Sequence, residues 1–197
     1  MRRATITACL TVAIGILTAG IFSTSAVAAE FRSGPQVGDL VGAFQVVKAA
    51  GAVDDGVSVG DELCYRCRMG NRPVVMVFAR SADDSLAGLV KQLDEVVAAN
   101  KEKKMGSFVS LLGDKPEELK SVAKSFVAKN KIENIPFVVP EENQTGPSEY
   151  SINPKADVTV LIYREGKVAA SHALAAGGLN DDEIKKILAD TSKVLHD

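Results

Sequence analysis

One run of apolar residues decides the class of fold. Residues 73–80 read PVVMVFAR, and all six positions from Val74 to Ala79 are apolar. A continuous apolar run that is rich in β-branched residues is typical of a strand buried on both faces, as in the sheets of α/β proteins. Residues 158–163, VTVLIY, have the same character. We expect these two stretches to lie side by side as inner strands of one sheet.

Helical periodicity follows the first of these strands. Apolar residues recur on one face from Leu86 to Val97, with Ser85 as the expected N-cap and an end near Asn100. Residues 30–62 are rich in Gly, Val and Asp and predict loops with one or two short strands.

The rest of the chain alternates in the same way. Its expected elements are a strand at 108–112, a helix that starts near Asp114, an extended piece at 135–140, a polar loop at 141–156, a hairpin at 158–174 and a helix from Asn180. Strands joined through helices favour parallel pairing with right-handed crossovers, and the closing hairpin adds antiparallel edges. We therefore predict an α/β fold, a central mixed β-sheet flanked by helices on both faces.

The first residues have the pattern of an export signal. Arg2 and Arg3 precede a mostly apolar run, and small residues at 25–29 offer a cleavage site before Glu30. Several threonines and glycines interrupt the run, which disfavours a membrane anchor. We expect residues 1–29 to be a signal peptide, residues 30–197 to be a single domain, and the product to be exported, periplasmic or extracellular, without stable membrane insertion.

Charge and composition exclude one class of partner. The whole chain has a net charge of −2, and loss of Arg2 and Arg3 would leave −4. Basic residues are mixed with acids along the expected helices, as on a solvated surface. Because there is no basic stripe, we expect no nucleic-acid partner.

Three stretches together resemble the thioredoxin-like superfamily, especially its exported thioredoxin-like and peroxiredoxin-like (redoxin) branch. Residues 37–44, VGDLVGAF, look like the redoxin opening, and residues 73–80 look like the strand that leads into the active site. Residues 162–168, IYREGKV, look like the hairpin of that family. The resemblance spans roughly Gly34 to His196 and implies a thioredoxin-like fold.

This sequence lacks the residues that carry out the usual chemistry of that family. The resemblance places a Cys-x-x-Cys after the central strand, where residues 81–86 read SADDSL and contain no cysteine. It also places a cis-proline before the hairpin strand, where Asp157 stands by register. The standard dithiol reaction at the standard place is therefore excluded. We interpret Asp83, Asp84 and Ser85 as helix capping in preference to a cation site.

The two cysteines left after signal removal, Cys64 and Cys67, precede the central strand. One interpretation is a redox couple, because residues three apart on a helical turn lie on the same side. Arg66, Arg68 and Arg72 would then favour the thiolate. A second interpretation is a structural disulfide, although closing a four-residue loop contributes only about 1.9 kcal/mol.

A third interpretation of Cys64 and Cys67 is a metal site. Two thiolates supply half of a tetrahedral zinc shell, but His172 and His196 lack ligand-like spacing. A copper(I) site shared with a partner remains conceivable. We predict no resident metal or cofactor.

Two functions follow from these observations. The first is an extracytoplasmic thiol-disulfide protein that uses Cys64 and Cys67 as catalytic residues on a protein thiol or disulfide partner. The alternative is a non-catalytic binding or scaffold module that has kept the fold and holds a structural disulfide. Whether the chain is an enzyme stays open at this point.

Overall fold

The central strand is β3, Val74–Ala79, and all six of its side chains are buried. This computed structural model describes residue 1 and residues 31–195, so nearly all of the expected signal peptide lies outside the described residues. Strand β3 pairs in parallel with β4, Gly106–Leu111, and antiparallel with β6, Ala156–Arg164. Val74 faces Tyr163 and Ala79 faces Val158. The expected side-by-side placement of the two apolar runs is confirmed.

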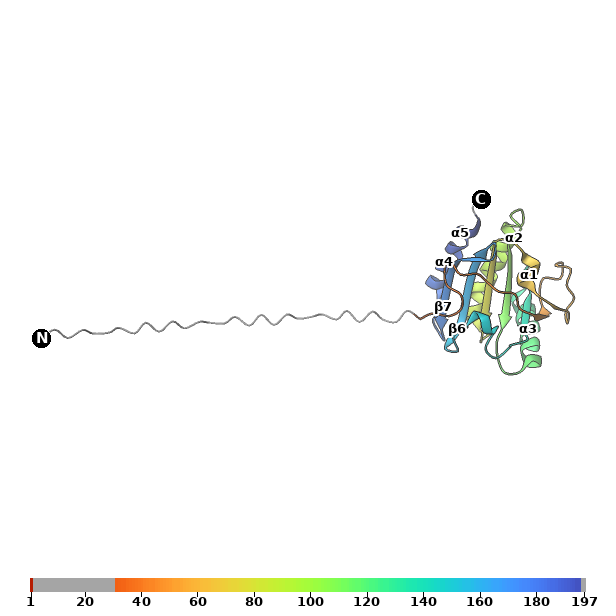
Figure 1. Ribbon diagram of the computed structural model, residues 1–197. Coiled ribbons are helices and arrows are strands. Elements are labelled where there is room, and N and C mark those ends of the chain that lie inside the picture. The colour runs from red at the N-terminus through yellow and green to blue at the C-terminus, as the bar shows by residue number, and fades with distance from the viewer. Residues whose placement is uncertain (2–30, 196–197) are drawn as a thin grey trace. The chain divides into compact units, whose positions relative to one another are not determined.

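Seven strands form one mixed sheet in the order β2-β1-β5-β4-β3-β6-β7 (Figure 1). The remaining strands are β1 Val46–Ala50, β2 Glu62–Leu63, β5 Phe137–Pro140 and β7 Lys167–Ala175. Strands β3, β4 and β5 run parallel, and β6 and β7 form the predicted antiparallel hairpin. The one or two short strands predicted for residues 30–62 correspond to β1 and to β2, which ends one residue later at Leu63 and pairs antiparallel with β1.

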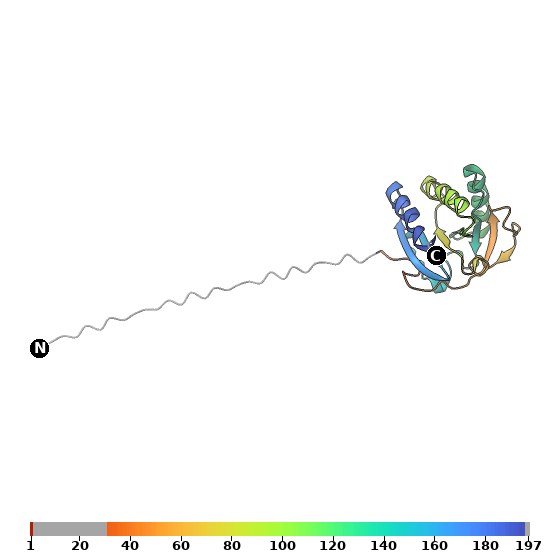
Figure 2. The same ribbon diagram turned by 90° about the horizontal axis from the view of Figure 1, so that it is seen from above.

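One face of the sheet packs against the long helices (Figure 2). Alternate side chains of β3, namely Val75, Val77 and Ala79, join a hydrophobic core with residues from every helix on that face. The long helices are α2 Asp84–Ala99, α3 Pro116–Asn130 and α4 Asp181–Asp190, and the four-residue α5 Ser192–Leu195 lies on the same face. Among residues 31–195, no helix is both long enough and apolar enough to cross a membrane.

Short elements cover the opposite face. There the helix α1, Tyr65–Met69, and the 3₁₀ turn η1, Ser148–Tyr150, bury Tyr65 and Tyr150 in a second core with Met76 and Phe78. Helices therefore flank both faces, as predicted, but the layer over this second face is much thinner. A thin layer brings the α1 segment, which contains Cys67, close to the surface.

The expected cap of α2 is wrong by two residues. Asp83, not Ser85, is the N-cap, and its Oδ1 accepts a hydrogen bond of 2.9 Å from the N–H of Leu86. Asp83 has the extended backbone that a cap requires, whereas Ser85 already lies in the first helical turn. The expected end of α2 near Asn100 and the cap at Asn180 are both confirmed.

Candidate redox site

A disulfide joins Cys64 to Cys67 at the start of α1, with their Cα atoms 5.2 Å apart. Cys64 is the N-cap of this helix and is half-buried, whereas Cys67 is exposed. A partner in solution therefore reaches the Cys67 sulfur more readily than the Cys64 sulfur.

The two cysteines are also joined by a hydrogen bond. The backbone N–H of Cys67 donates to Cys64 Sγ over 3.0 Å. A donor in this position stabilises negative charge on sulfur. When the disulfide opens, this hydrogen bond stabilises the electron pair on Cys64 Sγ, which makes Cys64 the better leaving group.

The disulfide lies at the opposite end of β3 from the position that the family resemblance assigns to catalysis. Helix α1 enters β3 at Val74, whereas Ser81 and Asp83 follow the strand at its other end. A strand of six residues is about 17 Å long. Cys64 and Cys67 therefore cannot act together with the side chains at the N-terminus of α2.

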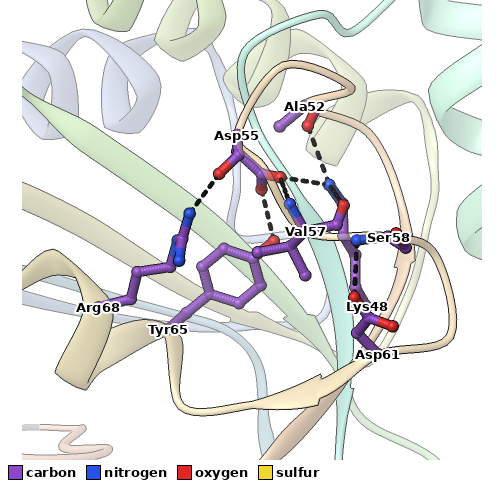
Figure 3. A network of polar contacts seen from close by, with 8 residues as sticks. All are labelled: Lys48, Ala52, Asp55, Val57, Ser58, Asp61, Tyr65 and Arg68. Carbon is purple, nitrogen blue, oxygen red and sulfur yellow. Dashed lines mark hydrogen bonds and ion pairs between the residues drawn. The ribbon is translucent and has the colours of Figure 1, made fainter.

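A buried ion pair between Lys48 and Asp55 lies next to the side chain of Tyr65 on helix α1 (Figure 3). Lys48 on β1 is only 1% exposed, and its Nζ lies 2.7 Å from Asp55 Oδ1. The same ammonium group donates to the carbonyl oxygens of Ala52 and Val57 over 2.9 and 2.8 Å. Three acceptors thus satisfy the three donors of the buried ammonium group.

Asp55 connects this ion pair to the segment between the cysteines (Figure 3). The hydroxyl of Tyr65 donates to Asp55 Oδ2 over 2.5 Å, and Arg68 donates to the Asp55 carbonyl oxygen over 2.6 Å. Burial raises the pKa of Tyr65 far above its ordinary value, and the hydrogen bond to Asp55 raises it further. Tyr65 therefore stays neutral and keeps donating, which fixes the position of α1 against the loop at residues 51–61.

The arginines next to the disulfide donate to backbone carbonyls. Arg66 Nε donates to Val41 over 3.1 Å, and Arg68 is held by Asp55 as described. Arg72 follows α1 and is exposed. Their effect on a thiolate at Cys64 or Cys67 stays a prediction.

The position that the family resemblance assigns to catalysis holds a polar pair. Ser81 Oγ donates to Asp157 Oδ2 over 2.6 Å, so these two positions face each other. No cis peptide bond occurs among residues 31–195. Asp83 caps α2, and Asp84 pairs with Lys129 on α3 at 3.2 Å. Asp83 therefore caps the helix and Asp84 pairs with a lysine, which agrees with our interpretation of these acids as helix-capping residues.

Among residues 31–195, the remaining candidates form no cluster of metal ligands. His172 on β7 is half-buried, and its Nε2 lies 3.1 Å from Asp190 Oδ2 on α4. His196 lies outside the described residues. In the part of the chain that the structure describes, no three His, Cys, Asp or Glu side chains gather as metal ligands.

The sequence identified the two cysteines but not the polar network of Lys48, Asp55 and Tyr65 that holds helix α1 in place. Lys48, Asp55 and Tyr65 are separated by seven and ten positions, and only the fold of the loop brings them together. One signal was present in the sequence, because Lys48 interrupts the otherwise apolar strand VVKAA. A lysine on an inner strand requires a buried partner, and Asp54 and Asp55 were the nearest acids in sequence.

No protein-family model and no curated protein matches the sequence. Solved structures do match. A Chlorobium tepidum protein assigned as a thiol:disulfide interchange protein DsbE aligns with a TM-score of 0.60 at 16% identity, covering 82% of this chain and 99% of that one. Peroxidoxin BcpB from Mycobacterium tuberculosis aligns with a TM-score of 0.55 at 13% identity, covering 81% and 97%.

A secreted Mycobacterium tuberculosis disulfide oxidoreductase, described as homologous to E. coli DsbE, is also similar. It aligns with a TM-score of 0.52 at 16% identity, covering 74% of this chain and 94% of that one. At such identities the likeness establishes the shared fold and leaves the chemistry to the residues of this chain.

Proposed function

Because the chain has a thioredoxin fold, we propose that it is an exported thiol-disulfide protein whose redox couple is Cys64 and Cys67. The observation that carries the proposal is the disulfide at the start of α1, with Cys67 exposed and the Cys64 sulfur accepting the Cys67 N–H. Solved structures described as thiol-disulfide proteins support it through their fold. Its partners would be protein thiols or disulfides.

The reaction proceeds by thiol-disulfide exchange at the exposed sulfur. A partner thiolate attacks Cys67 Sγ, a new S–S bond forms to the partner, and the Cys64–Cys67 bond breaks. The electron pair passes to Cys64 Sγ, where the Cys67 N–H stabilises the thiolate. A second partner thiolate then attacks the partner sulfur of the mixed disulfide. The partner leaves as a disulfide, and this protein is left with two reduced cysteines. The reverse sequence oxidises the protein.

A purely structural role for the disulfide is less well supported by the contacts around it. Closing a four-residue loop contributes only about 1.9 kcal/mol in the chain-entropy model. Helix α1 is already held through Tyr65 and Arg68, which both bond to Asp55. A disulfide that the fold does not need for anchorage is free to open and close.

Trapping of mixed disulfides tests the assignment of the two sulfurs. The reduced Cys64→Ser variant retains exposed Cys67 and should form a stable mixed disulfide with a disulfide-containing peptide, read by mass spectrometry. The reduced Cys67→Ser variant retains only half-buried Cys64 and should react at least about tenfold more slowly, because the peptide reaches this sulfur less readily. The double variant is the control without thiols. If neither single variant forms an adduct, the redox proposal fails.

A second candidate function is a binding or scaffold module with a structural disulfide. The hydrogen bond between Ser81 and Asp157 favours it, because this pair occupies the place where the fold usually holds its thiol chemistry. This candidate predicts that wild type and the Cys64→Ser/Cys67→Ser variant capture the same partner in a pull-down. Loss of capture in the double variant would contradict it.

Export is part of the proposal. Residues 1–29 would be removed as a signal peptide, leaving residues 30–197 as a single domain. One structural neighbour is described as secreted, which supports an extracytoplasmic place for this protein. N-terminal sequencing of the protein recovered from cells should begin at Glu30. Recovery of the intact N-terminus from the cell interior would overturn this part.

A further inference from the structure

A pocket of about 450 Å³ opens next to the disulfide helix, where β3 and β4 begin. Its wall starts at Arg68, the residue after Cys67, and continues through the turn into β3, the loop into β4 and the end of β6. Five of the nine lining residues are cationic, and none is acidic: the cations are Arg68, Arg72, Lys103, Lys104 and Arg164. This concentration of positive charge stands out in a chain whose net charge is −2.

Two of these cations have no competing partner for their charge in the structure. Arg72 and Lys104 are exposed, and their side chains make no ion pair or hydrogen bond with any residue from 31 to 195. Lys103 donates over 2.6 Å to the backbone carbonyl of Leu195, a neutral group that leaves its charge available.

The acidic residue that Arg68 contacts does not cancel the charge of this arginine. Arg68 bonds the carbonyl oxygen of Asp55, but the carboxylate of Asp55 is paired with Lys48. The pocket therefore presents its cations to solvent next to helix α1, which contains Cys67.

We infer that this pocket binds the carboxylates of an anionic thiol, which it places beside Cys67. The inference rests on the proposed redox function and names its substrate class: a thiol flanked by carboxylates, in a small molecule such as glutathione or in an acidic segment of a protein. Cations that face such a ligand raise its local concentration and the encounter rate. The same field favours the thiolate over the thiol.

The chemical step is the exchange described above. The sulfur of the anionic thiolate bonds to Cys67 Sγ, and the Cys64–Cys67 bond breaks with its electron pair on Cys64 Sγ. A second molecule of the same thiol displaces the first as a disulfide. Two partner thiols are thus oxidised for each protein disulfide reduced, and no other oxidant or reductant is required.

Two peptides that differ only in the charge of the residues flanking a cysteine test the inference. The oxidised protein is reduced by Ac-Glu-Cys-Glu-NH₂ or by Ac-Gln-Cys-Gln-NH₂, and each rate is divided by the rate of that peptide with hydroxyethyl disulfide, which is uncharged. This division removes the intrinsic difference between the two thiols. We expect the acidic peptide to be favoured by about threefold or more at low salt. The preference should disappear in about 0.5 M NaCl.

Two double variants locate the effect. Arg72→Gln/Lys104→Gln removes two pocket charges and should abolish the preference for the acidic peptide. Lys124→Gln/Lys155→Gln removes two exposed charges outside the pocket lining and should leave the preference intact. A preference that survives in the first variant, or is lost in the second, would overturn the pocket assignment.

Further experiments distinguish a small-molecule thiol from a protein thiol, and a failure of the pocket proposal from a failure of the redox proposal. Glutathione favoured over its diethyl ester assigns the pocket to a small anionic thiol, whereas a preference confined to the peptides assigns it to a protein segment. Equal normalised rates for both peptides would contradict the pocket proposal but not the proposed redox function. If dithiothreitol also fails to reduce the native disulfide, both proposals fall. Binding of Ac-Glu-Ser-Glu-NH₂, read by NMR shifts at Gly70 and Lys104, checks the pocket without sulfur chemistry.

Discussion

The hydroxyl of Tyr65 donates a hydrogen bond of 2.5 Å to the carboxylate of Asp55, ten positions earlier in the chain. Tyr65 lies between the two cysteines, so this bond fixes the disulfide helix to the loop at residues 51–61. The opposite oxygen of Asp55 accepts from Lys48. The disulfide therefore lies on a short helix whose position depends on this ion pair.

Replacing Tyr65 with phenylalanine should lower the free energy of unfolding by about 2 kcal/mol, because a hydrogen bond to a charged group is lost. The matched control is Tyr163→Phe. The Tyr163 hydroxyl is buried without a hydrogen-bond partner among the described residues, so its removal should be neutral or stabilising. Urea unfolding of both variants measures the difference. Equal losses would show that the Tyr65–Asp55 bond carries no special weight.

Lys48→Met should destabilise the protein by about 3 kcal/mol or more, because it leaves the partly buried Asp55 without its cation. Lys120→Met is the control, since it breaks an ion pair at the surface with Glu117, which is 85% exposed. We expect the control to change stability by about 0.5 kcal/mol or less. Denaturant titration compares the two, and similar costs would contradict a supporting role for Lys48.

Ser81→Ala should leave the rate of mixed-disulfide formation at Cys67 within about twofold of wild type, because the two sites lie at opposite ends of β3, about 17 Å apart. The variant loses the bond to Asp157 and should cost about 1 kcal/mol of stability. Stopped-flow kinetics with a disulfide peptide provide the rate. A tenfold loss would place the chemistry back at the N-terminus of α2.

Stability should fall as the pH is lowered from 7 through the ordinary histidine pKa of 6.5. Burial lowers the pKa of His172, and the neighbouring Asp190 only partly opposes that shift. The unfolded chain therefore binds a proton that the folded chain resists, and this difference favours unfolding in acid. His172→Gln should flatten this part of the profile in urea unfolding followed from about pH 7.5 to 5. A steeper profile in the variant would show that the charged pair with Asp190 dominates.

The inner strands were predictable because their burial on both faces leaves a direct trace in sequence. Residues 74–79 are apolar throughout, and residues 158–163 are buried throughout with Thr159 as their one aliphatic polar residue. The cap of α2 was harder. Both Asp83 and Ser85 are good capping residues, and the choice depends on where the chain leaves β3, which is a property of the sheet.

The candidate site divides in the same way. Cys64 and Cys67 were visible as a pair, but α1 has only five residues, too few for a periodic pattern to predict it. The basic pocket could not be predicted from the sequence. Arg72 and Lys104 are far apart in sequence and line the same pocket only because β3 and β4 start side by side. Which strands pair in parallel is a feature of the tertiary structure that local sequence patterns do not specify.

The reduction potential of the Cys64–Cys67 pair tests the central claim most directly. The native protein is equilibrated in glutathione buffers of graded potential, and its free thiols are counted by alkylation and mass spectrometry. We predict a reversible two-electron transition between about −270 and −120 mV, the range of thiol-disulfide oxidoreductases. A pair that stays oxidised until below about −300 mV would behave as a structural disulfide and contradict the account.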